Sequence, residues 1–110
     1  MAATYRIRLF FDYGSGICLW GGNATTVARF GYPIMPEQLA LSPATCAEVE
    51  RLILWHERSL DWSQPPAPVP WSDAECRAFN AALRHLRAAI ARELGDDYAL
   101  VNEQLDLQPS

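Results

Sequence analysis

The sequence contains no lysine, and all nine of its basic residues are arginine. Thirteen acidic residues outnumber them, so the formal net charge is −4 at pH 7. Binding to nucleic acid or to anionic lipid depends on clustered basic side chains. We therefore expect no nucleic-acid partner and no membrane partner, whereas a basic protein partner is compatible with this charge.

The sequence also has no long apolar run, and we expect no secretory leader. No run approaches the ~20 apolar residues that span a bilayer, and Met1 to Thr4 show no charged region, apolar stretch or cleavage site. The three cysteines, Cys18, Cys46 and Cys76, are odd in number and lack CxxC spacing, which fits a reducing compartment. We expect a cytoplasmic protein.

No motif for a metal, a nucleotide or a catalytic triad is present. His56 and Glu57 begin an HExxH pattern, but residue 60 is a leucine. We predict no cofactor, no metal and no catalytic residue, with His56 buried or partly buried for a structural reason and His85 exposed. The alternative is a small enzyme with a Cys or His centre, in which Cys18 stands beside a histidine.

The first third of the sequence predicts a hairpin. Alternating apolar residues from Tyr5 to Phe11 indicate a strand, Asp12 to Gly16 a turn, and Ile17 to Trp20 the returning strand. Thr25 to Phe30 is a candidate third strand, and Gly31 to Pro36 is typical of a loop.

A helix is expected to follow. Ser42 is a good N-cap and Pro43 suits the first helical position. The helix should end near Leu60 to Trp62, and the proline-rich stretch Ser63 to Pro70 should be an extended connector. Its apolar stripe consists of Cys46, Val49, Ile53, His56 and Leu60.

A second helix has clear start and stop signals. Ser72 to Glu75 form a capping box, Gly95 is the stop, and Tyr98 to Glu103 predict a final strand. Its stripe consists of Cys76, Phe79, Leu83, Leu86, Ile90 and Leu94. We predict that residues 1–110 form a single α+β domain: a small antiparallel β-sheet, made of the N-terminal hairpin and the C-terminal strand, packed against two helices.

Two tryptophans have no place in this core. Trp55 and Trp62 are seven residues apart and should share the side of the first helix opposite its stripe. Either the proline-rich stretch covers them, or they form an exposed patch that grips a partner.

Glutamates at the edge of the first stripe also allow two interpretations. Glu50 and Glu57 either pair with Arg84 and Arg87 of the second helix or stay free for a basic partner. Surface pairs of this kind would contribute only a few tenths of a kcal/mol.

Several segments combine helix caps, turns and tryptophans: Phe11–Gly21, Leu41–Thr45, Leu60–Trp62, Pro65–Pro66, Trp71–Ser72, Phe79–Asn80 and Glu93–Gly95 with Tyr98. These segments resemble a small bacterial family, the CdiI-like immunity proteins of contact-dependent growth inhibition systems. The resemblance extends from about residue 5 to residue 103.

The resemblance implies a non-enzymatic inhibitor that binds the toxic C-terminal domain of a cognate CdiA toxin, a nuclease in many such systems, and blocks its active site. It assigns no contact residue, so the candidates come from position alone. These are Asp12, Glu48, Glu57 and Asp61, with Trp55 and Trp62. We expect a monomer before complex formation; the alternative is a homo-oligomeric interaction module that uses the tryptophans.

Overall fold

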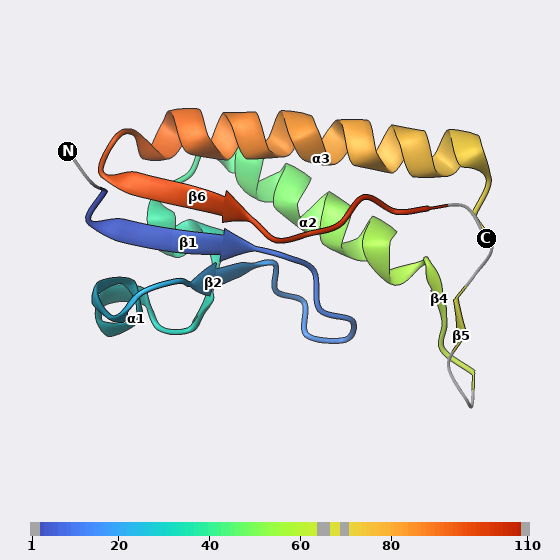
Figure 1. The fold of residues 1–110 in the computed structure, drawn as a ribbon, viewed down its shortest axis with the longest axis horizontal. Coiled ribbons are helices and arrows are strands. Elements are labelled where there is room, and N and C mark those ends of the chain that lie inside the picture. Colours follow the sequence, from blue (N-terminus) through green and yellow to red (C-terminus); the bar gives the residue numbers. More distant parts are fainter. Residues whose placement is uncertain (1–2, 64–66, 69–70, 109–110) are drawn as a thin grey trace.

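The computed structural model describes residues 3–63, 67–68 and 71–108, and a four-stranded sheet forms its centre (Figure 1). The strands lie in the order β3-β2-β1-β6. They are β1 (Tyr5–Leu9), β2 (Leu19–Gly21), β3 (Pro33–Ile34) and β6 (Tyr98–Asn102). The long helices α2 (Pro43–Glu57) and α3 (Asp73–Leu94) pack against this sheet, so the predicted α+β class is confirmed.

The sheet is mixed, whereas an antiparallel sheet is predicted. Leu9 of β1 lies opposite Leu19 in the antiparallel pair with β2. Tyr5 lies opposite Tyr98 in a parallel pair with β6. The C-terminal strand is parallel because α3 carries the chain back to the end of the sheet where β1 begins (Figure 1).

Residues 25–30, predicted as a third strand, form helix α1 (Ala24–Phe30) instead. The Asn23 side chain caps this helix by accepting a 2.9 Å hydrogen bond from the Thr26 N–H, and Gly31 ends it at φ 95°. The Thr26 hydroxyl also accepts a hydrogen bond from the backbone of β1. Threonines favour strands locally, but the asparagine cap and the contact with β1 decide the outcome.

Helix α2 begins where the sequence predicts and ends earlier. Ser42 caps it by accepting a hydrogen bond of 3.2 Å from the backbone three residues on. The predicted end near residues 60–62 is wrong, because the chain leaves the helix after Glu57. Ser59 donates both its N–H and its hydroxyl to the His56 carbonyl, which closes the last turn.

A small hairpin follows α2. Strand β4 (Leu60–Asp61) pairs antiparallel with β5 (Ala67–Pro68). The short 3₁₀ helix η1 (Pro36–Leu39) lies between β3 and α2. The rest of the predicted extended connector, residues 64–66 and 69–70, lies outside the described residues.

Helix α3 has the predicted boundaries. Ser72 caps it by accepting a 3.1 Å hydrogen bond from the Glu75 N–H, and Gly95 ends it at φ 83°. Positive φ costs little for glycine and much more for other residues, so the helix stops there. Within residues 3–63, 67–68 and 71–108, no helix has the length and apolar composition that crossing a membrane requires.

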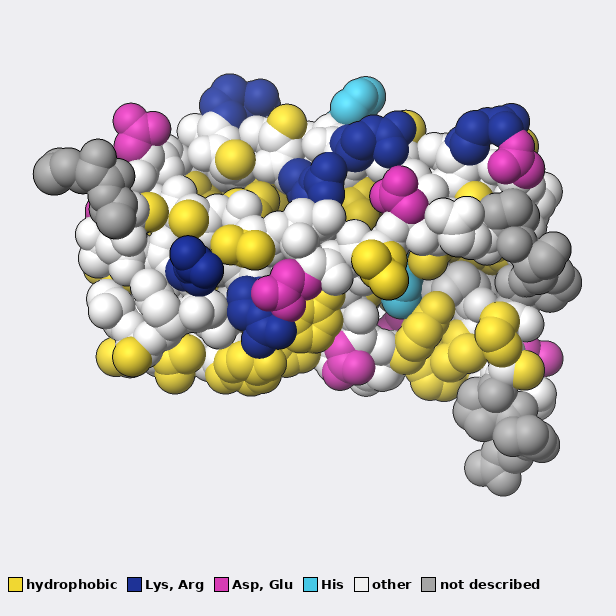
Figure 2. Space-filling model, in the orientation of Figure 1, with side chains coloured by type: hydrophobic (Ala, Val, Ile, Leu, Met, Phe, Trp, Pro, Cys, Tyr) yellow, Lys and Arg dark blue, Asp and Glu magenta, His cyan; other side chains and the backbone are white. Residues whose placement is uncertain are grey.

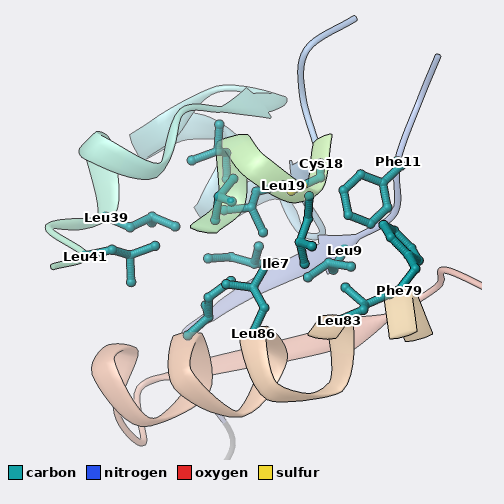
Figure 3. Close-up of a cluster of buried hydrophobic side chains, with 14 residues drawn as sticks. Ile7, Leu9, Phe11, Cys18, Leu19, Leu39, Leu41, Phe79, Leu83 and Leu86 are labelled. Atoms are coloured by element: carbon teal, nitrogen blue, oxygen red, sulfur yellow. The ribbon is translucent and has the colours of Figure 1, made fainter. Parts of the chain in front are cut away.

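Apolar side chains of the sheet and the two long helices meet in one core (Figure 3). Ile7 and Leu9 of β1 are fully buried and lie near Leu83 and Leu86 of α3. Each such side chain contributes about 1.5–3 kcal/mol through burial. Other core residues are Phe11, Cys18, Leu19, Ile34, Leu39, Leu41, Val49, Leu52, Phe79 and Ile90.

Candidate binding surface

The six predicted contact residues separate into two groups around α2. The first group lies at the C-terminal end of the helix and comprises Asp12, Glu57, Asp61 and Trp62. The second comprises Glu48 and Trp55, which both contact Arg51. The expectation that Trp55 and Trp62 share one side of a helix is wrong. Helix α2 ends at Glu57, and Trp62 follows strand β4.

A shallow hollow at the end of α2 holds most of the first group, and we call it the α2-end hollow. Trp62 is 51% exposed and Leu54 56% exposed, so the hollow offers apolar surface. Two carboxylates and one guanidinium stand among these side chains. Its lining residues are Leu54, Glu57, Arg58, Leu60, Asp61 and Trp62.

Trp62 is held in a fixed position although half of it is exposed. Its indole N–H donates a 3.0 Å hydrogen bond to the Glu57 carbonyl. Its ring lies edge-on to Tyr13, with 6.1 Å between ring centroids, and close to Gly14. A rigid, partly exposed aromatic ring loses little conformational entropy on binding, which is the property of a good anchor.

The loop between β1 and β2 is hydrogen-bonded to the C-terminal end of α2. The Gly14 N–H donates a 3.1 Å hydrogen bond to the Glu57 carboxylate. The Tyr13 hydroxyl shares a hydrogen bond of 2.5 Å with Ser59 just beyond α2. These contacts hold the loop, and with it the exposed Asp12, beside the α2-end hollow.

Asp61 presents a charged carboxylate at the rim. The backbone N–H of Ser63 donates a 3.0 Å hydrogen bond to it, which lowers the pKa of Asp61 below its ordinary value. The group is therefore ionised at neutral pH and available to a cation.

The second group is internally paired. Arg51 donates two hydrogen bonds, of 2.6 and 2.8 Å, to the Glu48 carboxylate, and these lower the pKa of Glu48. The same guanidinium lies 5.2 Å from the centre of the Trp55 ring. Trp55 is half-buried, packed edge-on against Phe79 at 5.2 Å between centroids. This side of α2 is thus already occupied by its own contacts.

His56 is buried, as the sequence predicts, and His85 is exposed. The imidazole of His56 stacks against the rings of Phe11 and Tyr13, with centroids 4.9 and 4.5 Å apart. Burial lowers the pKa of His56 to about 4, so the ring is neutral at pH 7. Its role in this setting is to pack the core edge.

The cysteines do not favour the enzyme alternative. Cys18 and Cys76 are buried and Cys46 is half-buried. Burial raises the pKa of Cys18 to about 12, which disfavours the thiolate that a nucleophile needs. In the part of the chain that the structure describes, no three His, Cys, Asp or Glu residues are grouped to hold a metal ion.

The charges of the two long helices stay apart. Among the described residues no salt bridge joins α2 to α3, so of the two interpretations of Glu50 and Glu57, pairing with Arg84 or Arg87 is not the one observed. Figure 2 shows arginine side chains gathered along the edge that α3 forms. Of the α2 glutamates, Glu48 pairs with Arg51, whereas Glu50 and Glu57 take part in no salt bridge among the described residues.

Leu54 belongs to this surface and is absent from the predicted contacts. A leucine next to Ile53 falls outside the helical stripe at ~100° per residue. That position could have indicated a contact residue, because a large apolar side chain outside the core stripe of a helix is expected to be exposed, and exposed apolar surface often marks a binding site.

The protein is thus a small α+β domain with a mixed sheet, and its surface carries a half-exposed tryptophan beside carboxylates. Residues 5–103 match the family described as Serratia CdiI immunity protein-like, so the chain belongs to that family. The resemblance noted from the sequence is confirmed. No curated protein matches the chain in sequence.

Proposed function

We propose that this protein is a cytoplasmic immunity protein that binds the toxic C-terminal domain of a cognate CdiA toxin and blocks its active site. The family match over residues 5–103 carries the proposal. The contact surface is the α2-end hollow with the adjoining loop, where Asp12, Glu57 and Asp61 supply negative charge and Trp62 an apolar anchor.

The toxin domain in this proposal is a nuclease with a basic active-site cleft. Carboxylates can occupy such a cleft in place of phosphates and also attract it during diffusional encounter. The net charge of −4 acts in the same direction. Neutralisation then needs no reaction by the immunity protein, which acts as one domain and is monomeric until it meets the toxin.

Glu48 and Trp55 remain predicted contacts but lie apart from this surface. The Glu48 carboxylate is neutralised by Arg51, and the Trp55 ring is committed to Phe79. An interface centred on the α2-end hollow therefore depends less on these two residues than on Asp61 and Trp62.

The test uses the toxin-like C-terminal domain that this proposal expects the neighbouring upstream reading frame to encode. Both proteins are purified, their affinity is measured by calorimetry, and nuclease activity is followed on DNA and RNA as immunity protein is added. A tight 1:1 complex that abolishes cleavage supports the proposal. Absence of a complex at micromolar concentrations, with both proteins folded, rejects it.

A further inference from the structure

A second hollow lies beside the α2-end hollow, and we call it the η1 groove. It runs between α2 and the segment around η1, and its walls are mainly apolar. Leu54 lines both hollows, so together they form one continuous surface along α2. The side chains that matter here are Met35, Glu37, Cys46, Glu50, Ile53 and Leu54.

The groove has room for a side chain from outside. Each water takes about 30 Å³ of liquid volume, and the groove encloses about 260 Å³. Met35 is 48% exposed and Leu54 56% exposed at its two sides. From Cys46 to Leu54 the helix rises roughly 12 Å, which is the length of about two helical turns of a partner.

Carboxylates border this apolar surface along its length. Glu37 and Glu50 line the η1 groove, and Glu57 and Asp61 line the α2-end hollow. Within the described residues none of the four takes part in a salt bridge. Arg58 is the single basic residue among those that line the two hollows.

This charge selects the occupant. In a symmetric contact between two copies the same patch meets itself, so four carboxylates would face four others at a cost in free energy. Nucleic acid and anionic lipid are disfavoured for the same reason. A cationic protein segment has the complementary charge.

We infer that the η1 groove receives an apolar side chain of the toxin domain that is flanked by basic residues, and that it fixes which toxin is recognised. This inference rests on the proposed function and extends the contact surface from the end of α2 toward its start. The carboxylates guide the basic segment, and the groove accepts only an apolar side chain of suitable size between them.

The first variant is Leu54→Arg, tested by calorimetry against the toxin domain. Because Leu54 lines both hollows, its effect is interpreted together with that of Glu50→Arg, which changes the η1 groove alone. Leucine and arginine have similar helix propensities, and the site is exposed, so the fold should persist. We expect the dissociation constant to rise by about 30-fold or more, the effect of losing a hot-spot contact. The matched control is Leu105→Arg, at a leucine that is 83% exposed outside both hollows, with a change below about threefold.

A charge pair of variants tests the rim. Glu50→Arg should weaken binding about tenfold, whereas Asp106→Arg, which makes the same reversal in the C-terminal segment, should have little effect. Equal affinities for the wild type, Leu54→Arg and Glu50→Arg would overturn the groove while leaving the immunity function in place. A wild-type protein that does not bind the toxin domain would overturn both.

Cys46 gives an independent readout without any mutation. It is the cysteine that lines the groove, whereas Cys18 and Cys76 are buried. Alkylation of Cys46 by iodoacetamide, quantified by peptide mass spectrometry, should slow at least tenfold when the toxin domain is bound. The same alkylation rate in free and bound protein would contradict the inference even if the complex is tight.

Discussion

His56 ties the stability of this fold to pH. Its imidazole is neutral and buried against two aromatic rings, with a pKa lowered to about 4 from the ordinary 6.5. Above pH 6.5 the ring is neutral in both the folded and the unfolded chain. As the pH falls toward 4 the unfolded chain takes up the proton first, so the free energy of unfolding decreases.

The expected loss across this window is up to about 3 kcal/mol, and urea unfolding at a series of pH values measures it. His56→Phe is the comparison, because phenylalanine keeps the ring stacking and does not titrate. The difference between wild type and variant should change between pH 6.5 and pH 4. If the two unfolding free energies stay parallel through that range, His56 titrates normally in the folded protein.

Asp61 distinguishes a binding role from a folding role. Its carboxylate is exposed and accepts a hydrogen bond from Ser63, two residues on. Asp61→Arg should change the free energy of unfolding by about 0.5 kcal/mol or less. Affinity for the toxin domain should fall by ~2 kcal/mol or more. Calorimetry and thermal unfolding of the same sample measure both, and losses of similar size would mean that Asp61 is structural.

Helix α1 depends on a close approach that only glycine allows. A Cβ on Gly21 of β2 would lie 2.7 Å from the Val27 side chain and 2.9 Å from the Gly31 carbonyl. Gly21→Ala must therefore push α1 away from the sheet, and overpacking of this kind costs about 1–3 kcal/mol. Chemical denaturation measures the loss. An unchanged midpoint would show that α1 shifts freely on β2.

The elements that the sequence predicts well are those with local signals. Ser42 and Ser72 cap α2 and α3 through hydrogen bonds within three residues, and Gly95 stops α3 by its own conformation. These signals lie in a few consecutive residues, so a pattern can reveal them. The alternation of Ile7 and Leu9 is local in the same sense.

The features that were missed depend on contacts between distant segments. Helix α1 is held by the hydrogen bond between Thr26 and β1, and the direction of β6 follows from the path of α3. Asp12 lies near the other residues of the first group because the Gly14 N–H binds the Glu57 carboxylate, 43 residues away. The end of α2 at Glu57 separates Trp55 from Trp62, and no spacing rule based on one continuous helix can predict that.

The distribution of charge over the whole protein determines how fast it should meet a basic partner. The carboxylates of the α2-end hollow and the η1 groove belong to η1, α2 and β4. Many of the arginines belong to α3, along another edge of the molecule (Figure 2). This separation gives the protein a charge asymmetry that orients it during encounter.

The association rate with the toxin domain should accordingly fall about tenfold as ionic strength rises from ~0.01 M to ~0.15 M. Over this range the Debye length shortens from about 30 Å to about 8 Å, so the attraction between charges is screened. The dissociation rate should change little, because the apolar contacts of Trp62 and Leu54 are not screened by salt. Stopped-flow fluorescence measures both rates. Arg84→Ala on α3 is the control, since it should leave the salt dependence intact, whereas Asp61→Arg should flatten it. An association rate indifferent to salt in the wild type would mean that shape alone, without these carboxylates, brings the two proteins together.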